Sequence, residues 1–227
     1  MIKEAIKMAT TGTNALLKQF GIKEVADVAF YVVGDIKVDD KGAVTFVGTE
    51  SSRKGPVLTF NTLKVSNLEF TGETSEARGG KGNTVLMSWD HSREATLTLE
   101  DALLSVDSLN TMLSNKTVGG DSDTDVITIT ADGFPGTYTV VGKTYARDAD
   151  GTDHLLTFVI WKAKVSAEAS FEMSADGDPS TLNMTLKVLR ADDNATIGSV
   201  AGEMVKMIID KSPSGTTSPT IVFPKGT

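Results

Sequence analysis

The sequence predicts a mainly β protein built from antiparallel strands. The clearest sign is the segment AKVSAEASFEMSA (163–175), in which small or apolar side chains alternate without a break with polar ones. Such alternation is typical of a strand with one buried and one wetted face. Shorter segments of the same kind recur along the chain, whereas segments with helical spacing are few. Glycine-containing turns separate several of these segments, which favours hairpins and therefore antiparallel pairing.

The predicted strands extend over most of the chain. Regular alternation adds strands at residues 95–99, 127–129 and 182–188. Less regular apolar runs predict further strands at residues 26–33, 42–48, 63–70, 83–89, 136–146 and 154–161. The Asp-Gly pair in RDADGTD (147–153) and the Lys-Gly pair in VDDKGAV (38–44) predict hairpin turns between strands. Residues 136–189 therefore read as an antiparallel meander.

One segment has clear helical spacing. In LEDALLSVDSLNTMLS (99–114) apolar residues recur at intervals of three and four, which predicts a helix at about 101–114. Asp101 lies near its start, where a negative charge interacts favourably with the helix dipole.

The two ends of the chain differ from its middle. Residues 1–20 predict a second helix or an arm, because TTGT (10–13) lowers helix propensity there. Residues 210–227 contain three of the six prolines and many small polar residues, which predicts an extended arm. With 227 residues and neither a linker nor an internal repeat, we expect a single domain spanning residues 1–227.

Composition excludes several classes of protein and site. A net charge of −8 argues against a protein that grips nucleic acid, because phosphate binding depends on basic patches. The absence of cysteine excludes disulfides, thiolate metal sites and cysteine nucleophiles. No apolar stretch approaches the length of a transmembrane helix, and the amino-terminal residues lack the apolar core of a signal peptide. We therefore expect a protein that is not secreted and has no membrane partner.

The segment SEARGGKGNT (75–84) resembles a phosphate-binding loop in its glycines and lysine, but the spacing of these residues does not match such a loop. A Walker A loop requires glycine where Ser75 stands, and serine or threonine where Gly82 stands. The acidic segment GGDSDTD (119–125) similarly resembles the start of a calcium-binding loop, yet Val126 occupies the position of the glycine that makes its sharp turn. We predict a structural or contact loop at 75–84, a solvated acidic loop at 119–125, and no cofactor or metal.

No constellation of residues predicts catalysis. The two histidines, His91 and His154, each follow an aspartate in the sequence. Neighbouring residues on a strand point to opposite faces, so neither aspartate is placed to orient its adjacent imidazole. Trp89 and Trp161 end apolar runs and are predicted to be packing residues. We therefore predict that the protein is not an enzyme.

Two stretches carry a resemblance to a known family. Residues 73–105, with ARGGKGN and WDHSREATLTLEDALLS, and residues 136–189, with KAKVSAEASFEMSADGDPST, resemble the major tail tube proteins and related virion structural proteins of tailed bacteriophages that infect Gram-positive bacteria. The resemblance covers somewhat under half of the chain. It implies an antiparallel β-sandwich or partial barrel with one flanking helix, assembled as hexameric rings that stack into a tube through which genomic DNA passes.

The resemblance also implies where functional residues lie. A bore-lining strand needs one packed and one wetted face, and the wetted residues of the long predicted strand are Lys164, Ser166, Glu168, Ser170, Glu172 and Ser174. The glycine-rich loop becomes a predicted inter-subunit contact, formed by Arg78, Gly79, Gly80, Lys81 and Gly82. The implied location is the virion tail, after synthesis in the host bacterial cytoplasm.

The implied partners are other copies of the chain and other tail proteins: the tape measure, the terminator, and the baseplate or distal tail. Double-stranded DNA would pass through without specific binding. Two alternatives stay open at this point: a capsid decoration or head-completion protein, and a monomeric β-sandwich module for carbohydrate binding or adhesion.

Overall fold

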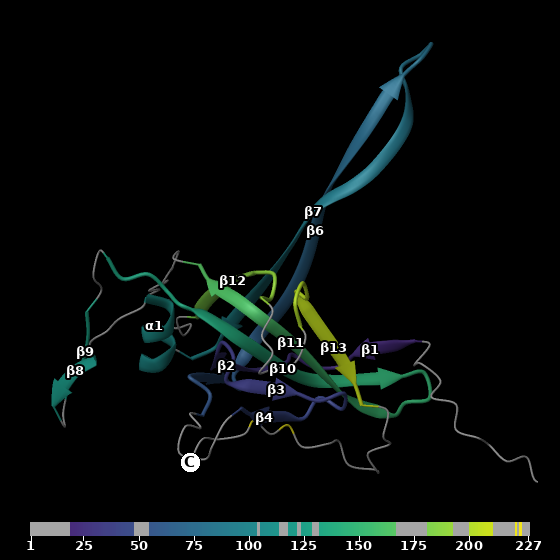
Figure 1. Ribbon diagram of the computed structural model, residues 1–227. Coiled ribbons are helices and arrows are strands. Elements are labelled where there is room, and N and C mark those ends of the chain that lie inside the picture. Colours follow the sequence, from purple (N-terminus) through teal and green to yellow (C-terminus); the bar gives the residue numbers. More distant parts are fainter. Residues whose placement is uncertain are drawn as a thin grey trace, which may run out of the picture.

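A computed structural model describes residues 19–47, 55–103, 105–113, 118–121, 124–128, 132–166, 181–192 and 200–210, together with residues 221 and 223. A nine-stranded sheet dominates this part of the chain, and every strand pairing in it is antiparallel (Figure 1). The sheet forms a sandwich-like arrangement that does not close into a barrel. The predicted mainly β, antiparallel fold with one flanking helix is confirmed.

The central path of the sheet runs in the order β5-β2-β10-β11-β12-β7-β6. Its strands are β5 (Leu58–Phe60), β2 (Asp27–Val32), β10 (Thr137–Asp148), β11 (Asp153–Val165), β12 (Leu182–Val188), β7 (Thr84–Asp101) and β6 (Leu63–Gly79). Off this path, β1 (Phe20–Ile22) pairs with β10, and β13 (Val205–Ile209) pairs with β11. Two short hairpins stand apart, β3 (Ile36–Val38) with β4 (Val44–Phe46), and β8 (Val118–Asp121) with β9 (Thr124–Ile127).

Both predicted hairpin turns are present. Between β10 and β11 the Asp148 carboxylate accepts hydrogen bonds from the backbone N–H groups of Asp150 and Thr152, and Gly151 adopts φ 85°. Between β3 and β4 the Asp39 carboxylate plays the same role, and Gly42 adopts φ 80°. Aspartate supplies the local acceptor and glycine the left-handed backbone that such turns require.

The central strands bury both of their faces. One face carries a core that includes Phe30 of β2, Leu97 of β7, Ile160 of β11 and Leu186 of β12. The opposite face carries a second core, in which Tyr31 and its neighbours pack against the β3–β4 hairpin. Towards the β12–β7 side, by contrast, exposure alternates residue by residue, as the sequence pattern predicts. The two cores make the fold sandwich-like, with β2, β10 and β11 in its middle.

The helix α1 (Val106–Leu113) begins later than predicted. Residues 101–105 were included in the predicted helix, yet Asp101 still belongs to β7, where it pairs with Leu182 and accepts a hydrogen bond from the Thr62 hydroxyl. Sheet pairing therefore outweighs helical periodicity at this boundary. The helix begins after Ser105, whose hydroxyl accepts a hydrogen bond from the Ser108 N–H at 3.0 Å while the Ser105 N–H donates to the Ser108 hydroxyl at 3.1 Å. This reciprocal pair caps the helix.

The long strand predicted at 163–175 is described only in part. β11 ends at Val165, and Ala163 and Val165 are buried while Lys164 is exposed, so the alternation holds as far as it is described. Residues 167–180 lie outside the described residues. Of the predicted arms, residues 1–18 also lie outside, as do residues 211–220 and most of 221–227.

Candidate assembly surface

The most prominent feature of the molecule is a hairpin that leaves the sheet. β7 pairs with β12 only along residues 95–101, so β6 and β7 continue beyond that point as a two-stranded ribbon (Figure 1). We call residues 72–93 the arm; none of them is buried. At about 3.3 Å per residue, the arm extends on the order of 30 Å from the sheet.

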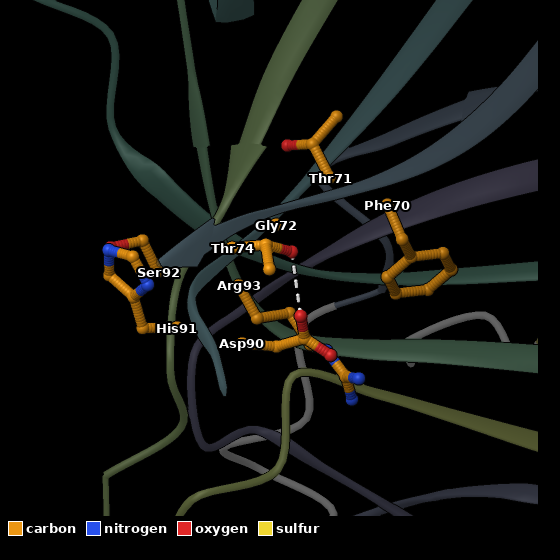
Figure 2. A pocket seen from close by; sticks show the side chains of 8 residues that line it. All are labelled: Phe70, Thr71, Gly72, Thr74, Asp90, His91, Ser92 and Arg93. Carbon is orange, nitrogen blue, oxygen red and sulfur yellow. Dashed lines mark hydrogen bonds between the residues drawn. The ribbon is translucent and has the colours of Figure 1, made fainter. Parts of the chain in front are cut away.

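A β-bulge marks the place where the arm leaves the sheet. The pairing shifts between Thr71↔Glu94 and Glu73↔His91, and Ser92 adopts a left-handed φ of 54°. A bulge of this kind increases the local twist and redirects the strands beyond it. The side chains around the bulge surround a concavity of about 760 Å³ (Figure 2).

The polar side chains at this bend pair across the hairpin. His91 Nε2 lies 3.4 Å from Glu73 Oε2. The Thr74 hydroxyl donates to Asp90 Oδ1 at 2.7 Å (Figure 2). Asp90 and His91 therefore have different partners, as the strand geometry predicts. Cross-strand pairs of this type stabilise the register of the arm, and they give His91 a structural rather than a catalytic environment.

The tip of the arm contains the predicted contact loop, and the turn is shorter than the sequence suggests. β6 continues through Gly79 and β7 begins at Thr84, so only residues 80–83 form the turn. Three of these have positive φ: Gly80 at 79°, Gly82 at 93° and Asn83 at 50°. Glycine permits this tight reversal, which explains its abundance here without a phosphate ligand.

Positive charge gathers at this tip. The Arg78 guanidinium donates to Glu76 Oε2 from Nε at 3.0 Å and from Nη2 at 2.6 Å. Lys81 has no ion-pair partner among the residues that the structure describes. The arm therefore presents cations at the end of a projection from a protein whose net charge is −8.

Next to the tip, the arm exposes large apolar side chains. We call them the apolar strip: Val85, Leu86, Met87 and Trp89, with exposed fractions of 44%, 65%, 67% and 52%. The strip lies on β7 opposite small residues, since Trp89 pairs with Ser75 and Met87 with Ala77. Exposed apolar side chains gathered on one segment are typical of an interaction site.

The prediction that Trp89 packs in the protein is wrong, because the strand that carries it leaves the sheet. Trp161, by contrast, is buried, and its indole N–H donates to Glu203 at 2.7 Å. The sequence did contain a signal for the strip: VLM (85–87) is apolar without alternation, in a segment predicted as one of the less regular strands.

A second apolar surface lies near the base of the hairpin. A groove of about 560 Å³ runs between β1, the segment that leads into β2, the base of β6, and β13. Its apolar lining is provided mainly by Phe20, Ile22, Val25, Leu68, Phe158 and Met207. Ile22 and Met207 are 65% and 55% exposed. Sequence reasoning missed this groove, because its lining comes from segments far apart in the chain.

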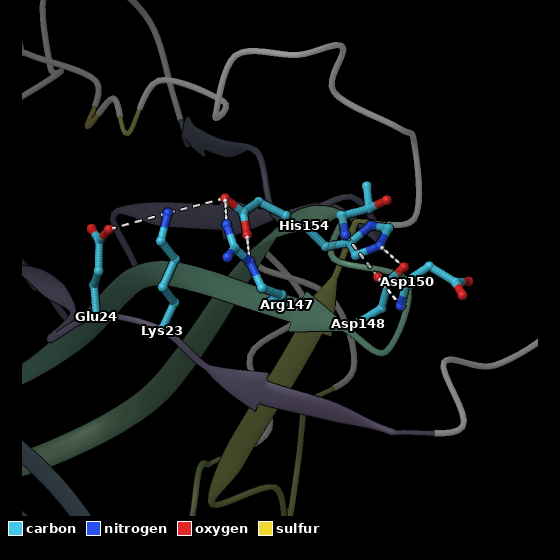
Figure 3. A network of polar contacts seen from close by, with 8 residues as sticks. Lys23, Glu24, Arg147, Asp148, Asp150 and His154 are labelled. Carbon is cyan, nitrogen blue, oxygen red and sulfur yellow. Dashed lines mark hydrogen bonds and ion pairs between the residues drawn. The ribbon is translucent and has the colours of Figure 1, made fainter.

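A network of charged side chains holds one end of this groove in place (Figure 3). Lys23 Nζ lies 3.1 Å from Asp153 Oδ2, and Arg147 donates to the same carboxylate from Nε at 2.7 Å and from Nη2 at 3.1 Å. The hydrogen bond from Arg147 is the main reason, followed by that from Lys23, why the pKa of Asp153 lies far below its usual range. The network joins the segment between β1 and β2 to the β10–β11 hairpin, and Glu24 lies beside it, 3.5 Å from Lys23.

His154 is buried in the same region with an acceptor at each ring nitrogen. Nε2 lies 3.0 Å from Asp148 Oδ2 (Figure 3). Nδ1 lies 3.2 Å from the backbone carbonyl oxygen of Asp210. The partner of His154 is therefore not its sequence neighbour Asp153, as strand geometry predicts. The His154 hydrogen bond, followed by the backbone N–H of Thr152, lowers the pKa of Asp148. The imidazole joins the hairpin turn to the end of β13.

This network predicts a loss of stability in acid. Asp148 and Asp153 have lower pKa values in the folded protein than the 3.8 of an unperturbed aspartate. Their contribution to the free energy of unfolding is therefore present above about pH 4 and decreases as the pH falls below it. Urea unfolding followed between about pH 6 and pH 3 should show this decrease. An Asp148→Asn, Asp153→Asn variant should lose stability near neutral pH and depend less on pH in the acidic range; an unchanged slope would contradict the assignment.

The predicted bore-lining set is described at two positions. Lys164 is exposed on β11 and pairs in register with Lys187 of β12, which is also exposed. Lys187 Nζ lies 3.3 Å from Glu94 Oε1 of β7. Ser166 is half-buried, and its N–H donates to the Thr185 carbonyl at 2.7 Å. Glu168, Ser170, Glu172 and Ser174 lie outside the described residues.

The predicted acidic loop forms part of the β8–β9 hairpin, in which Asp121 pairs with Thr124. Among the described residues, no three His, Asp or Glu side chains cluster in a way that could hold a metal ion. The helix in the described part of the chain is too short and too polar to cross a membrane.

A known family matches the part of the chain that contains the arm and much of the sheet. The model of the YomU/Tube protein family matches residues 40–121 and 117–202, more than half of the chain. The chain belongs to the YomU/Tube protein family. The matched residues include the whole arm, α1, and the strands from β10 to β12. No curated protein matches the chain.

Membership of this family assigns the chain to phage tube-type structural proteins and makes it a component of the virion tail. Proteins of this type are generally not enzymes. A tube family implies self-association and, at most, contacts with other tail proteins. In a YomU/Tube protein the candidate functional sites are therefore surfaces that can join subunits, and the arm is the most prominent of them.

Proposed function

We propose that this YomU/Tube protein is the major tail tube subunit of a phage infecting a Gram-positive host. It assembles into hexameric rings that stack into the tube through which genomic DNA passes. The observation that carries this proposal is the arm. A two-stranded ribbon is marginally stable in water by itself, and no described strand pairs with either outer edge of the arm. A neighbouring subunit that packs on the arm supplies the missing contacts.

The charged tip supports the same proposal. Arg78 and Lys81 lie at the end of the arm, while the chain as a whole is acidic. A second copy of the chain is therefore an electrostatically favourable partner for the tip. In this proposal Gly80 and Gly82 permit the tight turn that brings both cations to the contact, and Gly79 ends the strand just before it.

The wetted face of β7, β12 and β11 is the proposed lining of the bore. DNA slides most easily along a surface that does not attract its phosphates. Lys187 is paired with Glu94, which reduces the attraction of this lysine for DNA. Lys164 and Ser166 begin the lining, and Glu168, Ser170, Glu172 and Ser174 continue it. The tape measure, the terminator and the baseplate or distal tail proteins are the proposed partners inside and at the ends of the tube.

Electron microscopy and sedimentation of the purified protein test this function. We expect sixfold rings or tubes from the intact chain. An Arg78→Glu, Lys81→Glu variant should lose polymerisation, because two cations at the contact become anions facing an acidic neighbour. A Lys37→Glu, Lys41→Glu variant, with the same change of charge on the exposed β3–β4 hairpin, is the matched control and should polymerise. Normal tubes from the Arg78 and Lys81 variant would contradict the role of the tip.

A further inference from the structure

The arm and the groove are two exposed apolar surfaces that do not meet within one molecule. Leu68 lines the groove at the base of β6, whereas Ala77, opposite Met87 of the apolar strip, lies nine residues further along the same strand. At about 3.3 Å per residue, Leu68 and Ala77 lie about 30 Å apart along β6. Since the arm cannot fold back along its own strand, its apolar strip does not reach the groove of the same molecule.

We propose that the apolar strip of one subunit docks into the groove of a second copy of the same chain. The proposal rests on the tube function and names the surface that receives the arm. The groove volume of about 560 Å³ lies within the range of pockets that enclose ligands, and it accommodates several large side chains. Met87 and Trp89, more than half exposed on the arm, have the size and chemistry of such an occupant.

Charge favours a second copy as the occupant. The tip beyond the strip carries Lys81, which has no ion-pair partner among the described residues, and Arg78. Glu24, whose side chain is 53% exposed, lies at the rim of the groove. Arg78 is paired with Glu76. Glu24 lies 3.5 Å from Lys23, which also lines the groove, so the attraction depends on Lys81 and on the exposed part of Glu24. Docking the strip brings Lys81 towards this exposed carboxylate.

The arrangement of the two surfaces also fits a chain that binds itself. Each copy has one arm to give and one groove to receive an arm, so the donor and the acceptor occur in equal number. The two surfaces differ, which makes the contact heterologous. Heterologous contacts close into rings or continue into helical filaments, and either result propagates through identical copies.

The absence of cysteine allows a direct test by cross-linking. The variants Met87→Cys and Met207→Cys, one of them carrying a size tag, are mixed and oxidised. We expect a mixed disulfide in several-fold higher yield than from Met87→Cys mixed with Lys187→Cys, whose cysteine lies on the exposed face of β12. Equal yields from the two mixtures, or preferential pairing of Met87→Cys with itself, would overturn the proposal.

A mixing experiment tests the direction of the contact. One variant carries Met87→Asp and Trp89→Asp on the arm, and the other carries Ile22→Asp and Met207→Asp in the groove. All of these positions are exposed, so both variants should fold, which circular dichroism and urea unfolding verify. Neither variant should assemble alone. Mixed in equal amounts they should form pairs that do not grow, because only one arm and one groove in each pair are intact.

The outcomes separate the docking proposal from the proposed function. Normal tubes from the folded groove variant would overturn docking and leave the tube function standing. A specific link between Met87→Cys and Met207→Cys, in a protein whose intact form makes no rings or tubes, would confirm docking and overturn the tube function. Tubes from the equal mixture would also contradict docking, since half of the contacts would then be dispensable.

Discussion

Replacing residues 75–89 by Asn-Gly should abolish tube assembly and leave the fold intact. The replacement closes the hairpin between Thr74 and Asp90, which already pair, with a two-residue turn suited to antiparallel strands. It removes the tip and the apolar strip together, and it removes no buried residue. We therefore expect the free energy of unfolding to change by less than about 1 kcal/mol, while rings and tubes disappear from electron micrographs.

The shortened protein also serves as an inhibitor in the proposed assembly. It keeps the groove but has no apolar strip, so it accepts an arm and offers none. Added to the intact protein in increasing proportion, it should shorten the tubes progressively. Tubes of unchanged length, or a loss of stability comparable with that of a core mutation, would contradict the assignment of the arm to assembly.

The substitution Gly142→Ala should cause the largest loss of stability of any single change considered. Gly142 of β10 pairs with Phe158 of β11, and a Cβ atom at position 142 would overlap the Phe158 ring. Both strands lie in the middle of the sheet, so neither backbone can move away easily. Overpacking of this kind costs about 3 kcal/mol, a large part of the roughly 5–15 kcal/mol that stabilises a typical protein.

Urea and thermal unfolding measure this effect, with the melting temperature expected to fall by roughly 6–12 °C. Gly21→Ala is the matched control, because Gly21 also lies in a strand that pairs with β10 and nothing is within 4 Å of an added Cβ there. The control should change stability by less than about 0.5 kcal/mol. A Gly142→Ala, Phe158→Leu double variant should recover part of the loss, because a smaller side chain relieves the overlap; no recovery would place the cause elsewhere.

The strands and their turns could be predicted because their signals are local. Alternation along β12 and the core-facing end of β7, together with the Asp-Gly turn after Asp148, depends on residues close in sequence. The helix illustrates the limit of such signals. Its spacing extends back to Asp101, yet pairing with Leu182, distant in sequence, keeps Asp101 in the sheet.

The candidate site was predicted only in part for the same reason. The glycines and cations of residues 78–82 indicated a contact loop, and the structure places them at the tip of the arm. The exposure of Trp89 could not be predicted, because it follows from where β12 stops pairing with β7, at Ala95. The groove could not be predicted either, because Ile22, Leu68 and Met207 come together only in the folded chain.

The sequence by itself determined the antiparallel β class, the hairpin turns and the tight cationic tip, because periodicity, turn chemistry and charge act between near neighbours. Only the tertiary structure decided which strands extend beyond the sheet and which apolar residues remain exposed. That outcome depends on the register between distant strands. Val188 is the last residue of β12 that pairs with β7, so no described residue covers the apolar side chains of β7 on the arm side of Ala95.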